Sequence, residues 1–144
     1  MKKTIFVFLL SIAAIFTSNA QETGIKFQHD SWSKIVQKAR AEKKLIFMDA
    51  YTTWCGPCKM LQARVFPNKE LGDYFNQNFV NAKIDMESGE GPALANQYPI
   101  QGYPTLFFID PNTGKIVSQM LGYQEVGTLL SAGKAVVAKK GKKS

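Results

Sequence analysis

The chain contains only two cysteines, and they lie three residues apart in the run Trp54-Cys55-Gly56-Pro57-Cys58-Lys59. Two thiols at this spacing can close a small disulfide and reopen it. Residues 45–50 are apolar except for Asp49 and predict a buried strand, whereas residues 58–65 predict a helix. The pair is therefore expected where a strand turns into a helix. Unpaired backbone N–H groups and the helix dipole favour a thiolate there, and we expect Cys55 to be that thiolate.

Two other uses of the cysteine pair fit the sequence less well. A structural disulfide between residues three apart closes so short a loop that it removes little entropy from the unfolded chain. A structural zinc site uses four ligands, and beyond the two thiols the chain offers only His29, with no second cysteine pair. We therefore interpret the pair as redox-active, and we expect no metal and no other cofactor.

The first 20 residues have the three parts of a secretory signal, namely Lys2-Lys3, an apolar run over residues 5–16, and Ser18-Asn19-Ala20. The run is shorter than the 20 or so apolar residues that span a bilayer, so an uncleaved membrane anchor is the weaker alternative. We expect cleavage near Ala20–Gln21 and a periplasmic or otherwise secreted protein. Residues 21–138 then have the size of a single domain, followed by a Lys-rich tail over residues 139–144.

The formal net charge of +7 comes from the two ends of the chain. Eighteen Lys and Arg face eleven acidic residues, but six of the cations lie in the signal and the tail: Lys2, Lys3, Lys139, Lys140, Lys142 and Lys143. The twelve cations that remain nearly balance the acids, so the domain needs no basic patch and we expect no nucleic-acid partner. The tail is most simply a solvated end of the last helix, although it could touch anionic lipids or acidic partners.

Apolar periodicity divides the rest of the chain into alternating helices and strands. Helices are expected from Asp30 or Ser31 to about residue 40, and over residues 58–66, 69–77, 92–98 and 124–139; strands are expected over residues 45–50, 79–85, 105–109 and 115–121. The last two strands flank a turn at residues 110–114 and form a hairpin. This order predicts an α/β fold, in which a central mixed β-sheet is flanked by helices on both faces.

Four features occur in the order typical of the thioredoxin-fold thiol-disulfide oxidoreductases. They are Asp49 six residues before the first cysteine, the Trp-Cys-Gly-Pro-Cys-Lys run, Lys83 in the next strand, and Gly102-Tyr103-Pro104-Thr105 before an apolar strand. The chain resembles this family over roughly residues 30–138, which implies the thioredoxin fold. It is most similar to exported single-domain members and to the C-terminal domain of the transmembrane thiol-disulfide interchange protein.

The chain departs from the cytosolic members of that family at two places. Pro67 lies nine residues after Cys58, and Ala50-Tyr51-Thr52-Thr53 stands where thioredoxins are bulkier and acidic. These departures concern the choice of partner, whereas the residues of the redox chemistry are all present.

The resemblance implies a role for each residue of the redox chemistry. Cys55 attacks a disulfide in a partner protein, and Cys58 resolves the mixed disulfide. Asp49 stands among apolar neighbours, so burial should raise its pKa and suit it to take a proton from Cys58; a hydrogen-bonded Asp at a strand end is the alternative. Lys83 approaches Asp49 and biases its charge, or else is an ordinary solvated lysine.

The same resemblance implies a surface that binds the substrate. Trp54 and Tyr103 wall the site, unless they are ordinary core residues, and Gly56 and Pro57 lie between the thiols. Pro104 resembles the cis-proline of the family, which would expose the backbone of Tyr103 to an extended segment of the partner. We expect the remaining polar residues near these motifs to lie on the surface or in loops: His29, Lys59, Asp85 and Glu87.

The expected function is that of an exported protein disulfide reductase or thiol-disulfide interchange enzyme, which acts as a monomer on disulfide-containing client proteins. The compartment and the resemblance imply a membrane electron donor. A net disulfide oxidase or isomerase would share every residue and differ in redox potential. A chaperone-like module that binds clients without using Cys55 and Cys58 is the alternative from a different class.

Overall fold

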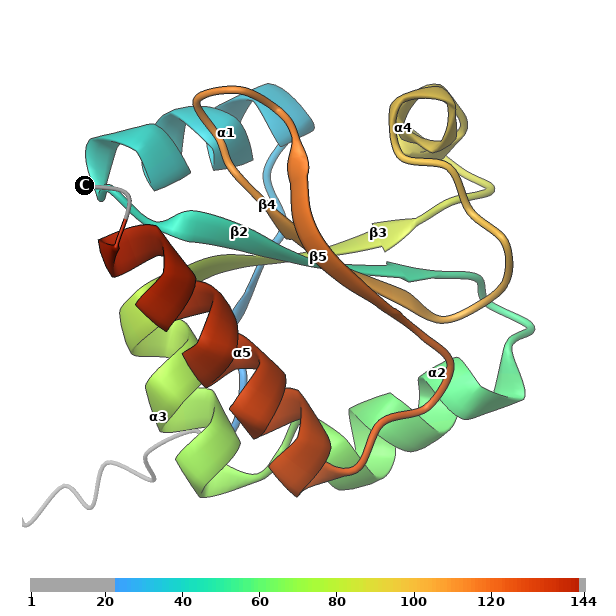
Figure 1. Ribbon diagram of the computed structural model, residues 1–144. Coiled ribbons are helices and arrows are strands. Elements are labelled where there is room, and N and C mark those ends of the chain that lie inside the picture. The colour runs from blue at the N-terminus through green and yellow to red at the C-terminus, as the bar shows by residue number, and fades with distance from the viewer. Residues whose placement is uncertain (1–22, 143–144) are drawn as a thin grey trace, which may run out of the picture.

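The computed structural model describes residues 23–142 (Figure 1). The predicted signal segment and the last two residues of the Lys-rich tail lie outside the described residues.

The described strands form one five-stranded mixed sheet in the order β1-β3-β2-β4-β5. β3 is parallel to β1 and β2, whereas β4 is antiparallel to β2 and β5 is antiparallel to β4. The strands are β1 (Phe27–Gln28), β2 (Leu45–Tyr51), β3 (Phe79–Asp85), β4 (Thr105–Ile109) and β5 (Ile116–Leu121). The predicted α/β fold with a central mixed sheet is confirmed.

Helices cover both faces of this sheet. They are α1 (Trp32–Ala41), α2 (Gly56–Met60), the π-helical turn η1 (Leu61–Val65), α3 (Lys69–Asn78), α4 (Gly91–Gln97) and α5 (Val126–Gly141). In Figure 1, α1 and α4 lie above the sheet, and α3 and α5 lie below it together with α2. Asn68, directly after Pro67, starts α3 because its side-chain oxygen accepts the backbone N–H of Leu71 at 3.0 Å.

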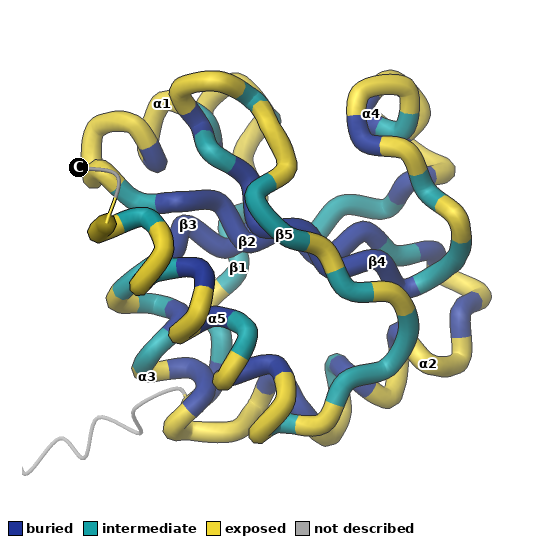
Figure 2. The backbone as a smooth tube through the Cα atoms, in the orientation of Figure 1, coloured by how far each residue is buried: buried dark blue, intermediate teal, exposed yellow. Residues whose placement is uncertain are grey.

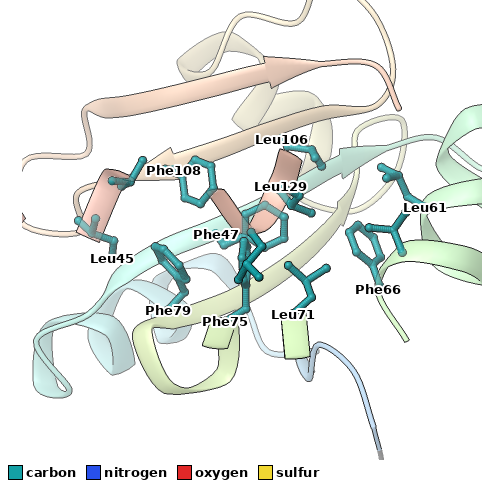
Figure 3. Packing of buried hydrophobic residues seen from close by; sticks show 13 residues of the cluster. Leu45, Phe47, Leu61, Phe66, Leu71, Phe75, Phe79, Leu106, Phe108 and Leu129 are labelled. Carbon is teal, nitrogen blue, oxygen red and sulfur yellow. The ribbon is translucent and has the colours of Figure 1, made fainter. Parts of the chain in front are cut away.

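Alternation along β2 produces two cores, one on each side of the sheet. Ile46 and Met48 pack with residues of α1 and α4, whereas Leu45 and Phe47 pack with residues of α3 and α5. Figure 2 shows the central strands as the most buried part of the chain. The core between the sheet and helices α3 and α5 is rich in aromatic rings, which gather around Phe47 in Figure 3. The ring of Phe75 stands edge-on to that of Phe47, with the ring centroids 4.8 Å apart.

Two local features differ from the expectations, and a glycine inside α5 has a packing role. β1 was not expected, because two residues are too few to show a strand's alternation, and its pairing with β3 forms the sheet edge. The helix after the cysteines changes to π geometry, with the N–H of Phe66 bonded to the carbonyl of Leu61. α5 contains Gly133 because a Cβ at that position would lie 2.8 Å from the ring of Phe75, so the glycine allows the close packing of α5 on α3.

Candidate functional site

The two cysteines form a disulfide at the point where β2 turns into α2. Cys55 is the N-cap of α2, and its Sγ accepts the backbone N–H of Cys58 at 3.2 Å. Cys58 is completely buried, whereas Cys55 is 3% exposed. Gly56 and Pro57, which lie between the two cysteines in the sequence, are exposed. Cys55 is therefore the slightly more exposed residue of the pair, which fits the expected order of attack.

Asp49 lies in β2 between apolar residues. It faces the same side of the sheet as Phe47 and is paired in register with Leu106 of β4. The residue is completely buried, and neither carboxyl oxygen has a hydrogen-bond partner among the described residues. Burial raises the pKa of Asp49 to about 7, against a smaller lowering by Lys83. The alternative of a hydrogen-bonded Asp at a strand end does not match this environment.

Lys83 is the register partner of Asp49 on β3. It is half-buried, and its Nζ lies 4.4 Å from the centroid of the Tyr51 ring. Burial lowers the pKa of Lys83, and the negative charge of Asp49 acts in the opposite direction. Lys83 is therefore packed beside the buried carboxyl group and is not a fully solvated side chain.

An exposed aromatic surface lies next to the disulfide. Trp54 is 64% exposed, and its ring stands edge-on to that of Tyr103, with the centroids 5.9 Å apart. The indole N–H of Trp54 donates to Oε2 of Glu87 at 2.9 Å. The Tyr103–Pro104 peptide bond is cis, and Pro104 is buried under this surface. The alternative that Trp54 is an ordinary core residue is therefore wrong.

Three residues at the site were missed by the sequence reasoning. Glu87 lies on the surface as expected, but it also holds the indole of Trp54. The ring of Tyr51 lies under the ammonium group of Lys83 in a cation–π contact. Leu121 is 55% exposed at the end of β5, close enough to Gly102 that a Cβ there would lie 3.3 Å from its Cδ1. Each of these contacts joins distant parts of the chain, so only the fold reveals them.

His29 and Lys59 are exposed, as expected. His29 lines a surface groove with Lys26 and Lys83, and Lys59 is exposed on α2. The described residues contain no group of three His, Cys, Asp or Glu side chains that could hold a metal ion. Within residues 23–142, no helix has the length and apolar character that crossing a membrane requires.

Comparisons with known proteins agree with this geometry. The thioredoxin family model matches residues 23–134. Protein disulfide-isomerase 1 of Dictyostelium discoideum is 32% identical over 117 residues, and the thiol:disulfide interchange protein DsbD of Tatumella citrea is 28% identical over 116 residues. Each alignment covers 78% of this chain, but the chain spans only 30% of the first relative and 20% of the second.

One solved structure is similar to this chain over nearly its own whole length. It is a Bacteroides thetaiotaomicron protein described as a proposed disulphide-isomerase, with 44% sequence identity and a TM-score of 0.71. The alignment covers 82% of this chain and 97% of that one.

Proposed function

The chain belongs to the thioredoxin family, and from this premise we propose that it is an exported enzyme that reduces or exchanges disulfides in client proteins through Cys55 and Cys58. The observation that carries the proposal is a disulfide at the start of α2, in which Cys55 retains slight exposure and Cys58 has none, directly after a strand that holds a buried, unpartnered carboxyl group. These are the parts that a two-step exchange of thiols and disulfides requires.

In the reducing direction the reaction has two exchange steps. The thiolate of Cys55 attacks a sulfur of the client disulfide, forms a mixed disulfide and releases the first client thiolate. The thiolate of Cys58 then attacks the sulfur of Cys55, which closes the Cys55–Cys58 disulfide and releases the second client thiolate. Two electrons pass to the client, whose thiolates take up protons, and a separate electron donor must reduce the pair again.

Asp49 is proposed as the group that takes the proton of Cys58 before the second step. A pKa of about 7 leaves the carboxyl group about half ionised at neutral pH, which suits a proton acceptor. The nearby charge of Lys83 favours the ionised form. Burial of both Asp49 and Cys58 keeps bulk water from this pair of groups.

Client proteins are proposed to dock on the exposed surface formed by Trp54, Tyr103, Gly56 and Pro57, with Pro104 beneath it. An extended segment can pair with the backbone there while its side chains contact the aromatic rings. The rings of Trp54 and Tyr103 are large and preset by their mutual contact and by Glu87, so little side-chain entropy is lost when a client binds.

The proposal also covers the compartment of the protein, the source of its electrons and the net direction of disulfide exchange. Residues 1–20 have the pattern of a secretory signal, which supports a periplasmic or secreted domain over residues 21–138. The similarity to a protein named for thiol:disulfide interchange supports a membrane electron donor for a monomeric enzyme. The two relatives named disulfide-isomerase favour isomerase activity as the second candidate, with the same residues.

The test is insulin reduction with dithiothreitol as the electron source, comparing the wild type with the Cys55→Ser/Cys58→Ser variant. The proposal requires rapid precipitation of the insulin B chain with the wild type and only the uncatalysed rate with the variant. Reduction above the uncatalysed rate in the variant would contradict the proposal, and a client-binding module without redox function would accelerate reduction with neither protein.

The role of Asp49 predicts a slower second step in the Asp49→Asn variant. Without the proton acceptor, release of the client from the mixed disulfide should slow about a hundredfold at pH 7, the lower range of general acid–base contributions. The difference should shrink as the pH rises, because hydroxide then deprotonates Cys58 directly. Single-turnover kinetics from a preformed mixed disulfide measure this step. Asp73→Asn, which removes an exposed carboxylate of α3, is the charge-matched control; equal rates in all three proteins would contradict the role.

A further inference from the structure

Four side chains at the ends of β2 and β3 face one side of the sheet. Asp49 and Tyr51 are two residues apart on β2, so they point to the same face. The parallel register pairs Asp49 with Lys83 and Tyr51 with Asp85. The sheet therefore brings a buried carboxyl group, a lysine, a phenol ring and a second carboxylate into one small cluster beside the redox disulfide.

Within this cluster the ammonium group of Lys83 lies over the Tyr51 ring. A distance of 4.4 Å from Nζ to the ring centroid is well within the range of a cation–π contact. None of the ion pairs in the described part of the chain involves Lys83, and the oxygens of Asp49 lie beyond its hydrogen-bond reach. Lys83 therefore acts on Asp49 through its charge, and its ammonium group is in contact with the Tyr51 ring.

On the basis of the proposed function, we propose that Tyr51 is a positioning residue. Its ring holds the ammonium group of Lys83 beside the buried carboxyl group of Asp49, and so it sets the pH at which Asp49 exchanges a proton with the resolving thiol. A lysine side chain has a long flexible stem and a strongly hydrated charge. Without the ring, the ammonium group would move toward water and away from Asp49.

The sign of the effect follows from the two influences on Asp49. Burial raises its pKa to about 7, and the positive charge of Lys83 acts in the opposite direction. Loss of the ring should therefore raise the pKa of Asp49 further. The other charged or titratable groups around the cluster are not altered by a substitution of Tyr51. They are Asp85 of β3, Glu87 of the following loop, the Cys55–Cys58 disulfide at the start of α2, and Lys26 and His29, which share a groove with Lys83.

The experiment is a titration of the Asp49 carboxyl carbon by NMR in the oxidised protein. Tyr51→Leu should raise the Asp49 pKa by about half a unit, a threefold change in proton affinity, because the charge of Lys83 would then lie farther from the carboxyl group. Tyr51→Phe keeps the ring and should titrate like the wild type. Tyr51→Ile, which favours a strand, repeats the test without the ring should the Leu variant fold poorly.

A double-mutant comparison separates positioning from simple burial. Lys83→Met should raise the Asp49 pKa at least as much as Tyr51→Leu, and adding Tyr51→Leu to it should change nothing further. A rise of the same size with and without Lys83 would show that the ring acts by shielding Asp49, and no rise in any variant would show no effect of the ring; either result overturns the proposal. The titration uses the disulfide form without a client, so it stands or fails independently of insulin reduction by the wild type.

The same shift should appear in the enzyme's pH profile. In the Tyr51→Leu variant, the pH at which the second exchange step reaches half its maximal rate should rise by the same half unit, whereas Tyr51→Phe leaves it in place. A titration shift without this kinetic shift would overturn the link between Tyr51 and the resolving step.

Discussion

Replacing Cys55 with serine is expected to reduce the rate of disulfide reduction to the uncatalysed background. A serine hydroxyl is not ionised at neutral pH and cannot form the mixed disulfide, so the first step has no nucleophile. Cys58 cannot take over this role because it is completely buried, whereas Cys55 retains some exposure. Insulin turbidity measures the loss, and the circular dichroism of the variant should match that of the reduced wild type.

Replacing Cys58 with serine should have a different outcome. Cys55 still attacks, but nothing resolves the mixed disulfide, so the client stays covalently attached. Mass spectrometry of the variant mixed with a disulfide-containing peptide should find the adduct on Cys55, at close to one per chain. An adduct on Cys58 in the Cys55→Ser variant, or turnover by either single variant, would contradict the assigned order of attack.

The second large effect is a pH-dependent gain in stability from Asp49→Asn. Between about pH 4 and pH 7 the unfolded carboxyl group is ionised while the folded one is protonated, so the folded state binds more protons. The free energy of unfolding of the wild type therefore falls as the pH rises through this interval. A pKa increase from 3.8 to about 7 corresponds to about 4 kcal/mol, lost in full above the folded pKa.

The variant has no charge at this position and should lack that loss. Urea unfolding of both oxidised proteins at pH values from about 4 to about 9 measures the difference, since other groups titrate alike in both. The wild type should lose about 4 kcal/mol relative to Asp49→Asn across the interval. Parallel stability curves would show that Asp49 has an ordinary pKa, and its proposed part in proton transfer would then have no physical basis.

Much of the fold followed from local patterns in the sequence. The strand at residues 79–85 matches the alternating segment and the strand at residues 105–109 matches the apolar run, and Pro67 with Asn68 marks the start of α3. β1 and the π-helical turn left no such signal. One is a two-residue strand held by pairing with β3, and the other is a shift in backbone hydrogen bonding that does not depend on a residue type.

The parts of the site that lie in sequence motifs or in paired strands could be predicted from the sequence. The cysteine run and Asp49 could be placed on a strand and the helix after it, and pairing of the predicted strands brings Lys83 opposite Asp49. The contact between Trp54 and Glu87 could not be predicted, because it joins residues 33 positions apart through the conformation of a loop. Exposure also depends on the whole fold, so Trp54 could not be assigned to the surface or the core beforehand.

The reduction potential of the Cys55–Cys58 pair decides whether this protein can act as a disulfide reductase. The protein is equilibrated with glutathione or dithiothreitol buffers, its thiols are alkylated, and the reduced fraction is read by mass. We expect one reversible two-electron transition at a strongly negative potential, near the value of about −270 mV known for thioredoxin. A pair that does not equilibrate, or a potential near the value of about −120 mV known for strong disulfide oxidases, would contradict a disulfide reductase.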